Sequence, residues 1–166
     1  LPIPTSWPQD GGPFMTLPLV VTSDPETGVH NLGMYRSQVF GPDEVGLHWQ
    51  KHKHGADHAE ASEDRMPVAI CLGGPPQVIF SAISPLPDNL SEYEFAGLLS
   101  GRRLKITKCL TNDLWVPADC DFVIEGYTLP SERRMEGPFG DHFGHYSLED
   151  EYPVMHVTAI THRKDP

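Results

Sequence analysis

The sequence predicts a mainly β protein whose strands form a closed or nearly closed antiparallel barrel. Runs rich in β-branched and aromatic residues predict the strands, which are Leu17–Thr22, Pro67–Leu72, Gln77–Ile83, Leu104–Leu110, Phe122–Leu129 and Val154–Thr161. Clusters of Gly, Pro, Asn and Asp separate these runs, and 15 glycines and 17 prolines in 166 residues are typical of a chain rich in turns. Short strands with irregular turns and few helices favour such an antiparallel barrel.

One segment clearly predicts a helix, from Glu92 to Ser100, and Gly101 ends it. Ser91 is a good N-cap, and Glu94 three residues later completes a capping box. Two shorter helical candidates are Val45–Lys51 and Ala56–Ser62.

Composition limits the classes of partner and the cellular compartment. A net charge of −11 argues against nucleic acid or an anionic membrane surface as a partner, because both repel an acidic protein. The three cysteines, Cys71, Cys109 and Cys120, lack CxxC spacing and their odd number fits no closed disulfide framework, so we expect reduced, buried thiols in a cytoplasmic protein. No signal peptide is recognisable, and no apolar run is long enough to cross a bilayer.

The ends of the chain suggest a piece of a longer protein. The sequence starts at Leu1 without a methionine and stops directly after a strand-like run. At 166 residues it is long enough for one domain with a core of its own. We therefore expect a single excised domain.

Two carboxylates flank a stiff turn and form the most informative stretch of the chain. Glu136 and Asp141 lie five residues apart, separated by Gly137, Pro138, a phenylalanine and Gly140. The glycines permit a positive φ, and the proline fixes its own. Two nearby carboxyl groups are expected to push each other's pKa apart, which would leave one protonated as an acid. The alternative is an ordinary Pro-Gly loop that carries two acids by chance.

Histidine is concentrated in one short segment, with His48, His52, His54 and His58 inside eleven residues. On a helix, pairs four residues apart share a face and can bind a divalent metal. The alternative is a solvated polar segment. Without a cysteine or an HExxH pattern, one functional histidine among bystanders is more expected than a four-histidine zinc site.

Further candidates lie outside these two stretches. Asn31 offers a neutral oxygen ligand for a hard cation, and Arg36 presents a planar fork that suits a carboxylate or phosphate. Glu92 opens the predicted helix, where it either stabilises the helix dipole or serves as a ligand. No phosphate-binding loop is present, and Gly73-Gly74-Pro75-Pro76 is interpreted as a turn that no helix N-terminus follows.

Taken together, these segments resemble the UbiD family of decarboxylases, which use prenylated flavin mononucleotide (FMN). In order, the matching segments are Trp7-Pro8-Gln9-Asp10-Gly11-Gly12, Asn31-Leu32-Gly33-Met34-Tyr35-Arg36, His48-Trp49-Gln50-Lys51-His52, Leu86–Tyr93, Phe95–Leu99, Val116-Pro117-Ala118, Glu125-Gly126, Glu136–Asp141 and Thr161-His162-Arg163. They cover nearly the whole chain and match the middle, flavin-binding domain only. The resemblance is nearest to the bacterial branch acting on hydroxybenzoates and polyprenyl-hydroxybenzoate. It implies a split β-barrel like that of flavin reductases, over residues 1–166, without the family's N-terminal and C-terminal domains.

The resemblance also implies a metal site and a cofactor site. In the family an Asn, a His and a Glu hold a divalent metal, and these match Asn31, His52 and Glu92, with His54 as the competing histidine. The implied ion is Mn²⁺ or Mg²⁺, with K⁺ as a further candidate. The implied contacts with prenylated FMN are Asn31, Met34, Tyr35, Arg36, His48, Trp49, Gln50, Lys53 and His54.

The catalytic network implied by the resemblance is an arginine and two acids, Arg36, Glu136 and Asp141. The second acid is often Glu elsewhere in the family, so Asp141 reaches less far. Loss of CO2 from an aromatic acid leaves charge that no ordinary side chain can delocalise, which explains the need for a flavin. Arg36 would orient the substrate, and Asp141 would donate a proton to carbon.

The implied partners are an aromatic carboxylic acid as substrate, a flavin prenyltransferase that supplies the cofactor, and further copies of the full-length protein in a homo-oligomer. Two other functions remain open at this point. One is a flavin-binding barrel that is inactive by itself, and the other is a metal hydrolase built on the histidine cluster.

Overall fold

A curled antiparallel sheet forms the body of the protein in a computed structural model that describes residues 1–49, 59, 62, 64–87 and 90–166. The strands of this sheet are β1 (Phe14–Met15), β2 (Leu19–Ser23), β3 (His30–Met34), β4 (Ser37–Val39), β5 (Glu44–Leu47), β6 (Met66–Leu72), β9 (Phe122–Glu136) and β12 (Asp150–His162). Their spatial order is β1-β4-β5-β12-β9-β6-β2-β3, and every neighbouring pair is antiparallel. The predicted mainly β, antiparallel fold is therefore confirmed.

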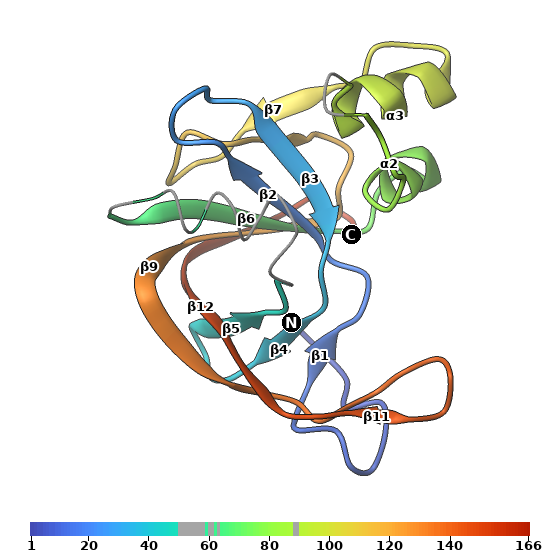
Figure 1. Cartoon of the computed structure of the whole chain (residues 1–166). Helices are drawn as coiled ribbons and strands as arrows, with labels where there is room; N and C mark the ends of the chain where they lie inside the picture. Colours follow the sequence, from blue (N-terminus) through green and yellow to red (C-terminus); the bar gives the residue numbers. More distant parts are fainter. Residues whose placement is uncertain (50–58, 60–61, 63, 88–89) are drawn as a thin grey trace.

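Two small ribbons and two helices complete the described part of the chain. The ribbons are β7 (Ile106–Lys108) with β8 (Trp115–Pro117), and β10 (Phe139–Gly140) with β11 (Tyr146–Ser147). The helices are α2 (Pro76–Ser81) and α3 (Glu92–Ser100), and both lie at one end of the sheet (Figure 1).

The long β9–β12 ribbon curls the sheet. The two strands pair from Glu136 and Asp150 to Phe122 and His162, with register shifts at two places along β12. Such irregularities bend a strand and increase its twist. Because β9 also pairs with β6 and β12 with β5, this ribbon joins the two halves of the sheet (Figure 1). In the described residues β1 and β3 end the sheet, so the barrel is split, not closed.

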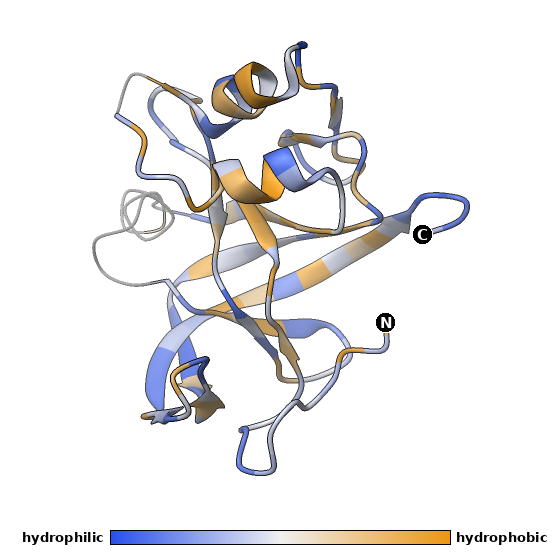
Figure 2. Ribbon diagram, turned by 90° about the vertical axis from the view of Figure 1, so that its right-hand side faces the viewer, coloured by the Kyte–Doolittle hydropathy of each residue, from blue (hydrophilic) through white to orange (hydrophobic). Residues whose placement is uncertain are grey.

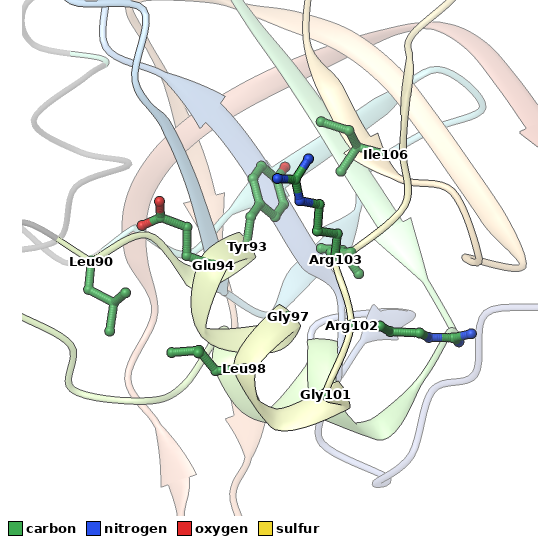
Figure 3. Close-up of a pocket in the computed structure, with 10 residues that line it drawn as sticks. Leu90, Tyr93, Glu94, Gly97, Leu98, Gly101, Arg102, Arg103 and Ile106 are labelled. Atoms are coloured by element: carbon green, nitrogen blue, oxygen red, sulfur yellow. The ribbon is translucent and has the colours of Figure 1, made fainter.

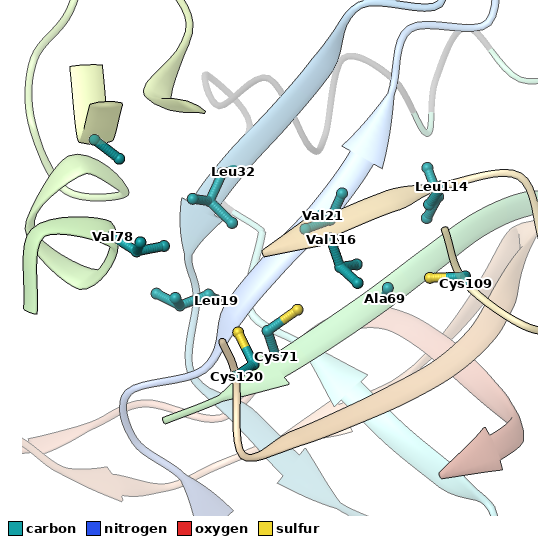
Figure 4. Close-up of a cluster of buried hydrophobic side chains, with 11 residues drawn as sticks. Leu19, Val21, Leu32, Ala69, Cys71, Val78, Cys109, Leu114, Val116 and Cys120 are labelled. Atoms are coloured by element: carbon teal, nitrogen blue, oxygen red, sulfur yellow. The ribbon is translucent and has the colours of Figure 1, made fainter. Parts of the chain in front are cut away.

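Two apolar clusters lie on opposite faces of the sheet, as the alternation along β2 requires. Leu19 and Val21 belong to the cluster under the helices, whereas Val20 belongs to the other. Figure 4 shows the first cluster, in which strand residues meet Val78 of α2. Figure 2 shows hydrophobic and hydrophilic residues alternating along the strand that ends at the C-terminus. The helix layer thus covers one face of β2, β3 and β6.

Helix α3 forms as its sequence predicts. The Ser91 hydroxyl accepts a hydrogen bond from the Glu94 amide at 3.2 Å, and the Glu94 carboxylate accepts one from the Ser91 amide at 3.2 Å. Gly101 ends the helix with a φ of 64°, a left-handed conformation that costs glycine little. The predicted helix and its capping box are confirmed. Cys71, Cys109 and Cys120 are free and buried, also as predicted.

Two predicted elements have the wrong type. Gln77–Ile83 was expected as a strand, but most of it lies in α2, which begins at Pro76 after the N-cap residue Pro75. A proline in the first helical position is already set for the helix, and Val78 packs into the core. A helix therefore does follow the Gly73-Gly74-Pro75-Pro76 turn. Val45–Lys51 was expected as a helix, but Glu44–Leu47 is β5 and pairs with both β4 and β12.

Other predictions differ in extent or cannot be compared. Strand predictions omitted β1, β3, β4, β8, β10 and β11 and stopped short of the full lengths of β9 and β12, whereas Leu104–Leu110 is a strand only at Ile106–Lys108. The helical candidate Ala56–Ser62 lies mostly outside the described residues. Among the described residues, none of the helices has the length and apolar character needed to cross a membrane.

Candidate active site

A pocket of about 630 Å³ opens where β3 ends and the chain turns towards β4. Its lining comes from the β3 end, the segment after α2, the start of α3 and the β10 region. The predicted site residues among those that line it are Asn31, Met34, Tyr35, Arg36, His48, Glu92 and Asp141. Segments far apart in the sequence therefore meet at one pocket.

Arg36 and His48 both bind Glu136, which is fully buried behind them. Arg36 Nε donates to Glu136 Oε1 at 2.9 Å and its NH2 group donates to Oε2 at 3.3 Å. His48 Nδ1 lies 2.7 Å from Oε2 of the same carboxylate. The side chain of Glu136 has no exposed surface, whereas Arg36 retains 15% and His48 18%. A buried carboxylate thus holds two cationic or hydrogen-bonding groups at the wall of the pocket.

Three further side chains fix this arrangement, and sequence reasoning missed all of them. The Arg36 guanidinium lies over the ring of Phe139, 4.6 Å from its centroid, and also donates to the Ser147 hydroxyl at 3.1 Å. The His48 ring packs against the Tyr152 ring in a tilted arrangement, with centroids 4.2 Å apart. Phe139 lies in the segment Glu136–Asp141, which we call the acidic turn. An aromatic residue between two acids could therefore have been predicted from the sequence as a site residue. Ser147 and Tyr152 follow from the β10–β11 and β9–β12 pairings, which the sequence does not reveal.

Glu136 is held as a carboxylate. Burial by itself would raise its pKa, but hydrogen bonds from His48 and Arg36 and the attraction of their charges lower the pKa below its ordinary value. The Arg36–Glu136 contact is charge-assisted and two-pronged, the geometry that suits an arginine and a carboxylate best.

Asp141 is held as a carboxylate by different groups. Its Oδ1 accepts from the amides of Phe143 at 2.9 Å and His145 at 3.1 Å. The hydrogen bond from the His145 amide lowers the pKa of Asp141 most, burial opposes it as the next largest effect, and the Phe143 amide lowers the pKa further. The expectation that Glu136 and Asp141 push each other's pKa apart is therefore wrong, because each carboxylate has its own donors and both pKa values fall.

The acidic turn is stiff for reasons that the sequence partly shows. Gly137 has a φ of 98°, which an L side chain rarely adopts. Gly140 has no such φ, but a Cβ there would lie 2.6 Å from Cδ1 of Trp7, so glycine is needed for close approach. The two glycines thus serve different purposes.

Asn31 and Glu92 lie on the same pocket, although 61 residues separate them. Asn31 is buried at 6% exposure, and Glu92 Oε2 accepts a hydrogen bond from the Leu32 amide at 3.3 Å. The other expected ligands, His52 and its competitor His54, lie outside the described residues, as does His58. Within the described ranges, no group of three His, Cys, Asp or Glu side chains is placed to hold a metal ion.

The remaining predicted flavin contacts fall into two groups. Trp49 is buried in the second core cluster and meets Tyr35 edge to face at 6.5 Å, so it supports the pocket wall from behind. Gln50 and Lys53 lie outside the described residues.

A second pocket, of about 890 Å³, lies along α3 and shares none of the predicted site residues. Tyr93, Leu98 and Ile106 supply apolar surface there, and Arg102 and Arg103 also line it (Figure 3). Most of the predicted catalytic and ligand-binding side chains that the structure describes therefore line the smaller pocket, at the end of β3.

The chain belongs to the UbiD family, because it matches the family's 3-octaprenyl-4-hydroxybenzoate carboxy-lyase Rift-related domain over residues 1–166. An uncharacterised protein of Archaeoglobus fulgidus is 50% identical over 169 residues, which cover 99% of this chain and 35% of that protein. The chain therefore spans about a third of the length of this relative.

Solved structures agree with this membership. HmfF of Pelotomaculum thermopropionicum, a UbiD-class enzyme in complex with FMN, is 36% identical with a TM-score of 0.95, covering 100% of this chain and 38% of that one. An evolved dimeric form of HmfF in complex with prenylated FMN has a TM-score of 0.94 at 36% identity, covering 100% and 39%. The closed form of vanillic acid decarboxylase from Sedimentibacter hydroxybenzoicus is 38% identical with a TM-score of 0.94, covering 100% and 37%.

The fold itself extends beyond the family. A split-barrel domain structure from Shewanella frigidimarina superimposes with a TM-score of 0.65 at 12% identity, covering 91% of this chain and 68% of that chain. This likeness concerns the fold alone, and it confirms the predicted split barrel.

Proposed function

We propose that residues 1–166 are the flavin-binding catalytic domain of a non-oxidative, reversible decarboxylase of aromatic, hydroxybenzoate-type acids. The observation that supports this proposal most is the composition of the pocket. Arg36, which is held by Glu136, lines it together with Asn31, Glu92 and Asp141. Family membership and the likeness to a vanillic acid decarboxylase support this choice of reaction.

The residues present fit a prenylated FMN and a divalent cation. A pocket of about 630 Å³ lies in the range of ordinary ligand sites. Asn31 and Glu92 offer oxygen atoms, which Mn²⁺ and Mg²⁺ prefer as ligands. Either ion would neutralise negative charge between the flavin phosphate and this acidic domain. His52 is the proposed third ligand, with His54 as its competitor, and K⁺ is a further candidate ion. The proposed flavin contacts are Met34, Tyr35, Arg36, His48, Trp49, Gln50, Lys53 and His54.

Arg36 is the proposed substrate-orienting group. Its guanidinium lines the pocket while Glu136 holds it from behind, so it can present N–H groups to a carboxylate without losing its position. Glu136 then acts through Arg36 and His48, because its own side chain is not exposed to the pocket.

Asp141 is the proposed proton donor to the substrate carbon after CO2 leaves. A bound prenylated FMN would supply the electron sink for this step. Since Asp141 is held as a carboxylate here, it must take up a proton before it can donate one. Enclosing the carboxyl in a filled pocket removes water and raises a carboxyl pKa, which favours that uptake.

The proposal includes partners and a location. The substrate is an aromatic carboxylic acid, a flavin prenyltransferase supplies the cofactor, and the complete protein is a homo-oligomer in the cytoplasm. Three free, buried thiols support a reducing compartment.

The test is CO2 release by the complete enzyme, produced together with a flavin prenyltransferase. The absorbance spectrum reports cofactor loading, and a panel of hydroxybenzoates and other aromatic acids is tested with Arg36→Ala as the inactive control. Turnover that depends on Arg36 supports the proposal. Protein that is loaded with prenylated FMN but releases no CO2 from any acid would refute it, and would favour a flavin-binding module instead.

A further inference from the structure

The N-terminal segment Trp7–Gly12 supplies none of the predicted site residues, yet it is hydrogen-bonded to the turn between Glu136 and Asp141. Asp10 Oδ1 accepts a hydrogen bond from the Gly140 amide at 2.8 Å, and the Gly11 amide donates to the Pro138 carbonyl at 2.8 Å. Figure 1 shows this N-terminal part of the chain beside the β10–β11 hairpin. The segment therefore contacts the turn at its middle and at its far end.

Asp10 is itself fixed by the segment that carries it. Its second oxygen, Oδ2, accepts from the Trp7 amide at 2.9 Å, so one carboxylate joins the two segments. The Trp7 ring packs where a Cβ on Gly140 would stand. Hydrogen bonds to a carboxylate are stronger than those between neutral groups, which makes this joint directional and firm.

Gln38 of β4 closes the other end of the turn. Its Oε1 accepts from the Gly137 amide at 2.7 Å, and its Nε2 donates to the Gly11 carbonyl at 2.9 Å. The side chain is buried at 5% exposure, so these bonds have little competition from water. Gln38 lies two residues after Arg36 in the sequence. Its side chain contacts Gly137 at the start of the turn, whereas the side chain of Arg36 contacts Glu136.

We propose that Asp10 and Gln38 are positioning residues that hold the turn between Glu136 and Asp141 in register with Arg36. This inference rests on the proposed decarboxylase function of the same site. Glu136 already has a fixed place through Arg36 and His48. Asp141 has no such bond to them among the contacts described, so its place depends on the turn. A displacement of about 1 Å in a catalytic group can lower a rate about 10²-fold.

The test compares Asp10→Ala with Asp24→Ala in the complete, cofactor-loaded enzyme. Asp24 is a matched control, because its carboxylate also accepts two backbone hydrogen bonds, from Glu26 at 2.8 Å and Thr27 at 2.9 Å, and the turn that it holds does not line the pocket. Gln38→Met is the second variant, since it keeps length and loses both hydrogen bonds. Deuterium uptake of a peptide spanning residues 136–147, flavin content, kcat and KM are measured for each.

We expect Asp10→Ala and Gln38→Met to speed deuterium uptake in that peptide and to lower kcat about 10- to 100-fold. Flavin content and KM should change by less than about 3-fold, because the pocket wall stays in place. Asp24→Ala should alter none of these. Unchanged uptake, or faster uptake with wild-type kcat, would overturn the positioning role alone. A wild-type enzyme without turnover would overturn the proposed function and this role together.

Discussion

Replacing Glu136 with glutamine should destabilise the domain far more than the same change at Glu132. Both glutamates lie on β9 and both contact a histidine at 2.7 Å, but Glu136 is fully buried while Glu132 is 32% exposed. Glu136 also accepts two bonds from Arg36. Both variants replace a glutamate that contacts a histidine, so the difference between their unfolding free energies reports the effect of burial and of the Arg36 contact.

The magnitude follows from the groups left without a partner. Hydrogen bonds to a charged group contribute about 1.5–3 kcal/mol each, and loss of one partner of a buried ion pair costs about 3–5 kcal/mol. The substituted amide would keep one acceptor oxygen and Arg36 has some access to solvent, so we expect Glu136→Gln to cost about 2–3 kcal/mol. For a domain of this size that corresponds to a fall in Tm of about 4–12 °C. Glu132→Gln should cost less than about 1 kcal/mol, as exposed pairs do.

The assay is thermal and urea unfolding of the 166-residue chain at pH 7 and at acidic pH. Burial favours protonation of Glu136, but the bonds from His48 and Arg36 lower its pKa below 4.5. A lowered folded pKa gives stability that is present above the unfolded pKa and lost as the pH falls through the folded value. The Tm difference between wild type and Glu136→Gln should therefore be full at pH 7 and shrink below about pH 4. Equal effects of the two substitutions, or a difference that grows in acid, would refute this reasoning.

Three further predictions concern function. In the complete enzyme, Asp141→Asn should keep its flavin but lose about 10²–10⁴-fold in decarboxylation rate, as expected for a general acid. Arg36→Ala should also impair substrate binding. Decarboxylation rates and deuterium incorporation into the product test both expectations. Asn31→Ala and Glu92→Gln should lower bound metal per protein by elemental analysis, and Glu94→Gln in the capping box should not; equal metal content in all three would contradict the site. The 166-residue chain alone should bind flavin weakly in a fluorescence titration, because an open pocket buries less of its ligand, and tight stoichiometric binding would contradict this.

The strands and the capped helix α3 could be predicted because their signals are local. β-branched runs mark β2, β6, β9 and β12, and Ser91 with Glu94 marks the start of α3. The segment Gln77–Ile83 misled the prediction because Val, Ile and Phe suit a strand as well as a buried helix. The deciding signal was Pro76, which suits the first position of a helix and cannot donate within a sheet.

The site was predictable only in part, because its contacts join distant segments. Arg36 and Glu136 were separate candidates from the sequence, and only the family resemblance joined them in one network. They lie 100 positions apart, and no local pattern shows that His48 shares the same carboxylate. The roles of Ser147 and Tyr152 depend on strand register in the same way. Local patterns therefore predict which residue types are present, and strand pairing decides which of them meet.

The two acids also show why proximity in sequence is a poor guide to pKa. Glu136 and Asp141 were expected to push each other's pKa apart, but each has separate N–H donors and both are carboxylates in this domain. A carboxylate near an aromatic C–H is suited to act as a base, which is the role that carboxylation requires. Decarboxylation requires the protonated form, and the donors of Asp141 are the amides of an exposed hairpin. An enzyme accelerates both directions alike, so enclosure of the pocket would change how readily Asp141 takes up its proton and not which direction is favoured, since exclusion of water raises a carboxyl pKa while Arg36 keeps Glu136 ionised.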